Sequence, residues 1–279
     1  MNNEQSTDRK YTLKNDVIFK TFFSRKGNEQ YLIDFLNGLL NIEIKEIEIR
    51  EEVNLEKLVQ DEKGGSLDLQ AKLDVGTIVN IEMQIRNKHN ITNRTTMYGA
   101  KVLSREVKRG TDYRDIKQII MINILDYNIL EYEEYISKTV TVLEKHREHE
   151  IIDGIKYYFI ELPKYRKQKP DMNEKINQWL AFIDGEDRGR IKMAQEKNET
   201  IKKAGIEMKE LTGDEEVRRI AELREKWEMD RISEINYAKE QGEKEKAIEI
   251  AKAMLEKGMD IELIHEVTKL SIEEIKNLK

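Results

Sequence analysis

The first two apolar segments of the chain have the spacing of helices that bury one face. In residues 14–23, apolar side chains stand at positions 18, 19, 22 and 23, and residues 29–40 repeat the same rhythm. Asn15 or Asp16 is placed to cap the first of these helices, because short polar side chains bond the free amides at a helix N-terminus. The sequence therefore predicts two helices, at residues 14–23 and 29–40.

Alternating apolar and polar residues then predict strands. Residues 66–75 alternate strictly, and residues 77–85 follow across the turn at Gly76, so the two form a hairpin. Residues 116–127 are the most apolar strand of the chain, which predicts a central position in the sheet. The other elements expected here are strands at 44–55, 138–145 and 156–165 and a long helix at 91–109.

The chain changes character after about Pro170. Strand patterns end there, and Lys, Glu and Arg dominate the rest of the sequence. Helices are expected at 172–184 and 186–241, with interruptions near Gly205 and at 211–214. The pattern divides the chain into an α/β domain, a charged helical region and a small helical tail, at residues 1–170, 171–242 and 243–279.

The tail has the rhythm of a helix-turn-helix. A helix reaches Lys257, Gly258 stops it, and Ser271 with Glu274 forms a capping box for the last helix. The acids at the start of that helix would repel phosphate, and residues 243–279 hold seven Lys against nine Asp and Glu. The sequence therefore favours a packing or oligomerisation unit, through which the chain can form a homo-oligomer, over a DNA-reading arm.

Composition narrows the classes of protein that remain. The chain has 279 residues, of which 37% are charged and 38% hydrophobic. It has no cysteine, which excludes disulfides, thiolate zinc sites and cysteine nucleophiles. No stretch approaches the roughly 20 apolar residues of a membrane span, and the N-terminus lacks the apolar run of a signal peptide. These features predict a cytoplasmic protein without a membrane partner.

Positive charge gathers in one segment of this slightly acidic protein. Between Arg86 and Lys117, nine basic residues face three acids, a local balance of 9 − 3 = +6, whereas the whole chain carries −6. One interpretation is a solvated helix face. The other is a surface that faces phosphate groups beside a functional site. The sequence alone does not decide between them.

The hairpin carries the residues best suited to chemistry. Glu82 and Gln84 share one face of their strand, and Asp68 on the neighbouring strand points away from the apolar residues beside it. A carboxylate in an apolar strand is costly unless it is paired or binds a metal, and two carboxylates on adjacent strands can hold a hard cation such as Mg²⁺. The alternative is that both acids belong to the polar outer face of an ordinary hairpin.

The order of helix, hairpin with D…E-x-Q, helix and buried strand resembles the core of the PD-(D/E)XK nuclease superfamily. Within it, the chain resembles the Rpn-like recombination-promoting nuclease and putative transposase family. The similarity lies in residues 13–23, 67–85 and 93–103 and covers about residues 10–165, and the helical remainder is also typical of that family. The resemblance implies an α/β fold with a mixed sheet flanked by helices, followed by a charged, all-helical C-terminal region.

The resemblance also implies roles for the acids. Asp68 and Glu82 would bind Mg²⁺ or Mn²⁺, and Asp16 resembles the supplementary acid that the family places on its first helix. Gln84 stands where the superfamily usually has Lys, so it can position water by hydrogen bonds but brings no positive charge. The family itself commonly has Gln here.

The basic segment completes this picture. Arg94 and Lys101 are seven residues apart and share a helix face with Tyr98, and Arg105 follows one turn later. These three cations are the candidates for binding the phosphates of DNA. The resemblance implies a metal-dependent DNA endonuclease linked to recombination or mobile elements. The alternative is an inactive nuclease scaffold that binds nucleic acid or protein.

Overall fold

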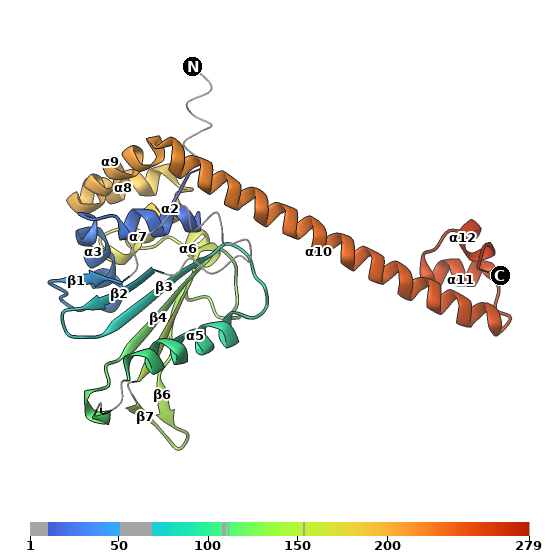
Figure 1. The fold of residues 1–279 in the computed structure, drawn as a ribbon, viewed down its shortest axis with the longest axis horizontal. Coiled ribbons are helices and arrows are strands. Elements are labelled where there is room, and N and C mark those ends of the chain that lie inside the picture. The colour runs from blue at the N-terminus through green and yellow to red at the C-terminus, as the bar shows by residue number, and fades with distance from the viewer. Residues whose placement is uncertain (1–10, 51–68, 108–109, 111, 153, 279) are drawn as a thin grey trace. The chain divides into compact units, whose positions relative to one another are not determined.

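A computed structural model describes residues 11–50, 69–107, 110, 112–152 and 154–278 (Figure 1). The chain forms two compact units, residues 1–222 and 223–279, and each is described by itself. Among the described residues, no helix is long and apolar enough to cross a membrane.

The first unit is built on a six-stranded mixed sheet with the order β1-β2-β3-β4-β8-β5. Strands β3, β4 and β8 are parallel to one another, and the remaining neighbours pair antiparallel. The strands are β1 (Ile47–Ile49), β2 (Leu69–Leu73), β3 (Ile78–Gln84), β4 (Ile119–Leu125), β5 (Ile136–Lys138) and β8 (Ile155–Glu161). The predicted mixed sheet is confirmed.

The predicted hairpin and central strand are also present. β2 pairs with β3 in antiparallel register, with Leu69 opposite Ile81 and Lys72 opposite Ile78. All seven residues of β4 are buried, because β4 lies between β3 and β8 and both faces of the sheet are covered.

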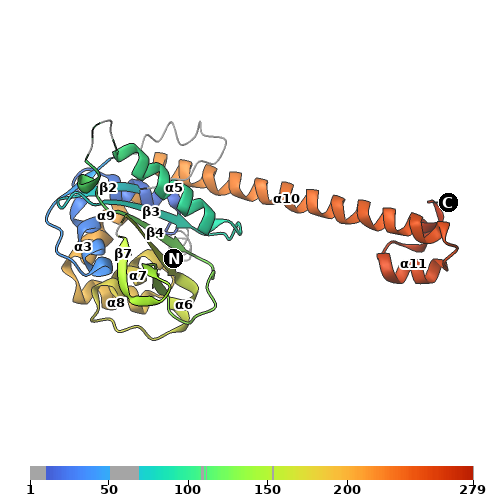
Figure 2. The ribbon, with the colours of Figure 1, turned by 90° about the horizontal axis from the view of Figure 1, so that it is seen from below.

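Alternation along β3 separates two cores. Val79, Ile81 and Met83 enter the main core, which α2 (Asp16–Ser24), α3 (Glu29–Leu40) and α7 (Lys175–Asp184) cover. Ile78 faces the other way, into a smaller core beneath α5 (Ile91–Glu106). Figure 1 shows these helices on opposite faces of the sheet, and Figure 2 shows the sheet from the side of α5. The side chain of Asn15 caps α2 by accepting from the amides of Val17 and Ile18.

Two predicted strands are placed differently in the structure. The strand expected at 156–165 ends at Glu161, and α6 (Leu162–Lys167) begins there with a proline in its first turn, where proline fits a helix. The segment expected as one strand at 138–145 is divided. Lys138 ends β5, and β6 (Thr141–Leu143) pairs with β7 (His146–Ile152) in a separate two-stranded sheet. The sequence did not predict β7, because the charged residues at its start show no apolar alternation.

Helices α8 (Arg188–Lys197) and α9 (Glu199–Gly213) complete the first unit. The interruption expected near Gly205 is absent, because Gly205 lies inside α9. The break falls instead at Asn198, whose side chain accepts from the amides of Thr200 and Ile201 and so starts α9. The interruption predicted at 211–214 is confirmed by Asp214, which separates α9 from α10 (Glu215–Glu256).

The second unit consists of the greater part of α10 with α11 (Ile261–Thr268) and α12 (Ile272–Lys276). α10 continues through residue 242 without a break. Gly258 has φ +71° and ends the helix as predicted, and the capping box of Ser271 and Glu274 is formed in full. A small core holds the three helices together through Ala251, Ile264, Leu270 and Ile275.

Two glycines in helix interiors predict opposite responses to the same substitution. A Cβ at Gly38 would lie 3.0 Å from the backbone nitrogen of Ile176, where α3 meets α7. We expect Gly38→Ala to lower the free energy of unfolding by about 1–2 kcal/mol through overpacking. A Cβ at Gly205 would be tight only against the flexible end of Gln195, and Phe182 lies at an ordinary contact distance of 4.0 Å, so Gly205→Ala should leave stability unchanged or raise it by up to about 1 kcal/mol. Urea denaturation checks both, and equal effects would contradict the packing argument.

Candidate active site

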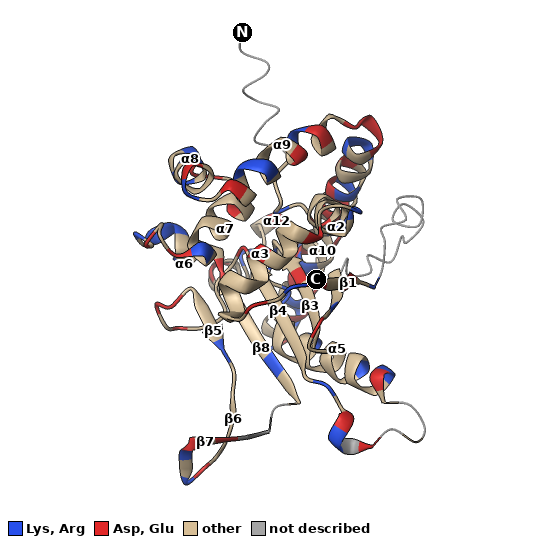
Figure 3. Cartoon of the chain, turned by 90° about the vertical axis from the view of Figure 1, so that its left-hand side faces the viewer, with Lys and Arg blue, Asp and Glu red and all other residues tan. Residues whose placement is uncertain are grey.

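The site is built around the only charged side chain in strand β3. Glu82 alternates with residues of the main core, so its side chain turns to the opposite face, the one covered by α5. The strands in the middle of the sheet carry almost no charge (Figure 3), and Glu82 is only 2% exposed. A carboxylate in such surroundings requires polar partners that replace water.

Two side chains contact the same oxygen of Glu82, one by a hydrogen bond and one by an ion pair. The amide Nε2 of Gln84 donates to Glu82 Oε1 at 2.6 Å, and Nη2 of Arg94 lies 2.8 Å from that oxygen. Gln84 comes from the same face of β3, two residues further on, whereas Arg94 comes from the first turn of α5. The guanidinium therefore balances the buried negative charge.

A tyrosine extends this arrangement. The hydroxyl of Tyr127 donates to Gln84 Oε1 at 2.6 Å. Burial raises the pKa of Tyr127 to about 12, and the nearby charge of Glu82 acts in the same direction, so this hydroxyl keeps its proton at neutral pH. Two hydrogen bonds and one ion pair thus connect Tyr127, Gln84, Glu82 and Arg94, which are called the Glu82 network below.

Sequence reasoning found three of these four residues and missed Tyr127. Its position two residues beyond β4 was the available signal, because side chains that follow parallel strands meet at one edge of the sheet. The backbone N–H of Asp126 donates to the backbone oxygen of Gln84 at 2.8 Å, which continues the pairing of β3 and β4 past the last strand residue. This bond places Tyr127 beside Gln84.

Arg94 also has bonding capacity that the described residues do not use. Its Nε is buried, and it has no hydrogen-bond partner within the part of the chain that the structure describes. The guanidinium carbon lies 5.3 Å from the centre of the Tyr98 ring, and Nζ of Lys101 lies 5.6 Å from the same ring. The predicted common face of Arg94, Tyr98 and Lys101 is therefore present.

The other two predicted cations lie outside the buried part of the site. Lys101 and Arg105 are exposed on α5, the helix that covers the face of Glu82. Both are available to a polyanion in solution. Their role in binding DNA stays a prediction.

The remaining predicted acids are placed as follows. Asp68 lies outside the described residues, which resume at Leu69, opposite Ile81. Asp16 is the first residue of α2, and its Oδ1 accepts from the amide of Val17 at 2.9 Å. α2 packs on the face of the sheet opposite to Glu82. The packing of this helix therefore does not bring Asp16 to Glu82. A role for either acid in metal binding stays a prediction.

The donor set of the described residues fits a hard cation in part. Glu82 offers carboxylate oxygens, the ligand type that Mg²⁺ and Mn²⁺ prefer. Within the described ranges, no three His, Asp or Glu side chains gather closely enough to hold a metal ion. Glu82 therefore needs at least one further acid to complete such a site.

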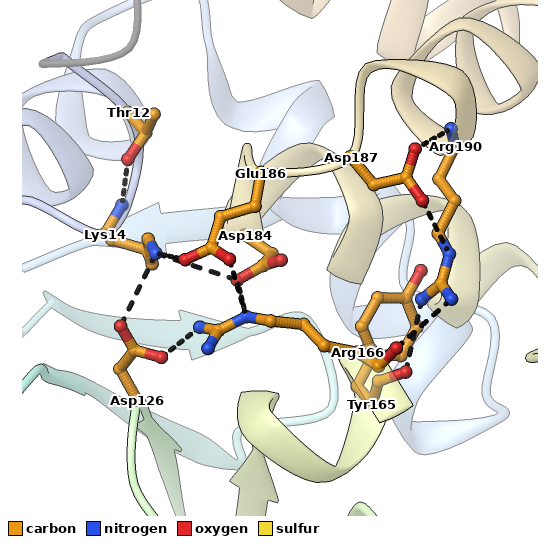
Figure 4. A network of polar contacts seen from close by, with 9 residues as sticks. All are labelled: Thr12, Lys14, Asp126, Tyr165, Arg166, Asp184, Glu186, Asp187 and Arg190. Atoms are coloured by element: carbon orange, nitrogen blue, oxygen red, sulfur yellow. Dashed lines mark hydrogen bonds and ion pairs between the residues drawn. The ribbon is translucent and has the colours of Figure 1, made fainter. Parts of the chain in front are cut away.

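A second polar cluster holds the end of β4 on the other face of the sheet (Figure 4). Asp126 binds Arg166 and Lys14, and these two cations also bind Asp184 and Glu186. Asp184 Oδ1 lies 2.9 Å from Arg166 Nε, and burial raises the pKa of Asp184 despite these cations. We call these five residues the Asp126 network; it ties β4 to the helices that cover the main core.

Two family models match the chain. A model described as PD-(D/E)XK nuclease family transposase matches residues 13–238, and a model described as Rpn/YhgA-like nuclease family, C-terminal HTH domain matches residues 244–279. The second match agrees with the helix-turn-helix rhythm of the tail. A search of curated proteins and a search of solved structures each found no significant match.

The ion pair between Arg94 and Glu82 predicts a measurable loss of stability. Arg94→Met leaves the buried carboxylate without its cation, so the free energy of unfolding should fall by about 2–4 kcal/mol, below the full value for a buried pair because Arg94 is 21% exposed. Urea denaturation measures this. Adding Glu82→Gln to that variant should restore most of the loss, and Arg105→Met serves as an exposed control. Unchanged stability in Arg94→Met would show that Glu82 does not depend on this cation.

Proposed function

The chain belongs to the PD-(D/E)XK nuclease family transposases, and we propose that it is a divalent-metal-dependent DNA endonuclease that hydrolyses phosphodiester bonds in recombination or the movement of mobile elements. One observation carries the proposal. Glu82 is buried in an apolar sheet, and it is held by an amide and a guanidinium at the carboxyl end of a parallel strand. Such an arrangement is expensive to bury for structure alone and suits a functional site.

The proposed metal ligands are Glu82 and Asp68, with Asp16 as a supplementary acid. Asp68 directly precedes Leu69, whose partner Ile81 is the neighbour of Glu82, and this pairing supports the choice of Asp68. Mg²⁺ or Mn²⁺ bound there would offset charge on the phosphate and increase the acidity of bound water.

Within this proposal, each residue of the chain has a separate task. Gln84 holds the Glu82 carboxylate in place and, as predicted from sequence, positions the attacking water with its remaining amide hydrogen. Arg94 supplies the positive charge that the superfamily's usual Lys would bring. Its side chain is 21% exposed, and a charged donor aimed at developing negative charge on a phosphate would stabilise the transition state. Lys101 and Arg105 bind the neighbouring phosphates.

The C-terminal unit supports a DNA partner through its match to an HTH domain. α12 nevertheless begins with Ile272, Glu273 and Glu274, and two acids at this position weaken contact with phosphate. We therefore assign the main electrostatic contacts with DNA to α5 and leave to the tail the packing and oligomerisation that its sequence favours.

A second candidate function is a binding or assembly module that has lost catalysis. The binding module is favoured by Gln84, which stands in the usual position of Lys. It is also favoured by the ion pair of Arg94 with Glu82, because this pair engages a carboxylate oxygen that a metal would need. Both candidates keep the basic face of α5, so DNA binding does not separate them. Strand cleavage does.

Plasmid nicking tests the proposed activity. Purified protein should convert supercoiled plasmid to open circles with Mg²⁺ or Mn²⁺ and not with EDTA. Asp68→Ala and Glu82→Ala should each lower the rate by at least about 100-fold, because a metal ligand is lost, and Glu48→Ala, an exposed acid on β1, should not. Full activity in both variants would place the chemistry elsewhere. DNA binding without nicking by the wild type would select the binding module.

The salt dependence of DNA binding tests the basic face of α5. Lys101→Ala with Arg105→Ala should reduce the slope of log K against log salt by about 2, since each lost phosphate contact removes about 0.9 on duplex DNA. The matched control is Lys203→Ala with Lys209→Ala, two exposed lysines on α9. Fluorescence anisotropy at four salt concentrations measures both pairs. Equal slopes in the two pairs would assign this face of α5 to solvent.

A further inference from the structure

Tyr127 lies where its hydroxyl can hold the side-chain amide of Gln84. The hydrogen bond from the backbone N–H of Asp126 to the backbone oxygen of Gln84 continues the pairing of β3 and β4 beyond Leu125. The side chains of Leu125 and Tyr127 therefore turn to the same face. Tyr127 packs there against the small core of Ile91, Leu125 and Phe159. Its ring is therefore held by packing, and its hydroxyl is presented to the Gln84 amide at 2.6 Å.

The Glu82 carboxylate only accepts hydrogen bonds, so it selects the nitrogen end of the Gln84 amide, and the Tyr127 hydroxyl fixes the oxygen end. A carboxamide has a donor end and an acceptor end, and the two ends exchange places when the group rotates by half a turn. With its oxygen bonded to Tyr127, the amide directs its nitrogen to Glu82 Oε1. The reversed amide would set its oxygen against the carboxylate, and two acceptors would repel each other. Lysine has only donors, so a site with lysine in this position has no acceptor end for a hydroxyl to hold.

We propose that Tyr127 is a positioning residue of the site, which holds the Gln84 amide against Glu82 by donating to the amide oxygen and thereby keeps that carboxylate oriented for a divalent cation. This inference rests on the proposed function, because it gives Glu82 the role of a metal ligand. Tyr127 acts through Gln84 and is not itself assigned contact with the metal or the DNA. It is the residue that allows an amide to replace the usual lysine.

Mn²⁺ binding to the full chain tests this hold on the Gln84 amide, called the lock below. Tyr127→Phe keeps the packed ring and removes only the hydroxyl. Titration calorimetry should show Mn²⁺ binding weakened by about 10–100-fold, the range for loss of a group that orients a metal ligand. The control is Tyr135→Phe, which removes a similar bond of 2.8 Å to Asn177 away from the site and should leave Mn²⁺ affinity unchanged. Equal Mn²⁺ affinity in Tyr127→Phe and wild type overturns the inference.

A double-mutant cycle separates positioning from general support of the fold. Gln84→Lys replaces the amide by a group without an acceptor end. Adding Tyr127→Phe to Gln84→Lys should therefore change Mn²⁺ affinity by no more than about twofold. Such a result means strong coupling between the two positions. If Tyr127 only supported the strand ends, its removal would have the same effect in both backgrounds, and that result also overturns the inference.

Failure of the activity and failure of the lock give different results. A wild type that binds Mn²⁺ without nicking plasmid contradicts the proposed endonuclease, and the effect of Tyr127→Phe on Mn²⁺ affinity still decides the lock. A wild type that neither binds Mn²⁺ nor nicks overturns both. A wild type that nicks, with Tyr127→Phe unchanged in Mn²⁺ affinity and in nicking rate, keeps the function and removes the lock.

Discussion

The negative charge of Glu82 in the apolar middle of a sheet is the constraint around which the first unit is organised. Without partners, a buried carboxylate is among the most unfavourable groups that a fold can contain. Arg94 reaches it from α5, which packs closely on the sheet at Gly99, where a Cβ would lie 3.2 Å from Cγ2 of Ile155. The position of α5 is thus set by the needs of one side chain as well as by apolar packing.

The end of β4 links this constraint to the rest of the unit. Asp126 and Tyr127 are neighbours, and they serve opposite faces of the sheet: Asp126 joins the ion pairs with Lys14 and Arg166, and Tyr127 bonds to Gln84. The Asp126 network therefore fixes the backbone from which Tyr127 projects. Helices that never contact Glu82 contribute to its environment through this pair of residues.

Much of this could be predicted from local patterns. Strict alternation in the hairpin places Glu82 and Gln84 on one face, and helical spacing places Arg94 on the segment that follows. Tyr127 could not be found this way, because it follows a strand and carries no periodic signal. The break at Asn198 was also not predicted, because it depends on a side-chain cap within a sequence that is itself helix-compatible. The end of β8 at Glu161 was not predicted either, because α6 follows directly and Glu161 makes no side-chain cap. Asp68 lies outside the described residues, so the candidate site is complete only as a prediction.

The spacing of these contacts along the chain sets an order for the assembly of the site. Gln84 and Arg94 are near neighbours of Glu82 in sequence, whereas the bond to Tyr127 spans 43 residues and the pair of Lys14 with Glu186 spans 172. Contacts between residues that are distant in sequence form late in folding, because closing a longer loop costs more conformational entropy. During synthesis, a ribosome-bound chain that ends before Glu186 can already have made its hairpin and α5, yet lacks part of the cluster that holds β4. The backbone that carries Tyr127 is therefore held in place only after most of the first unit has been made.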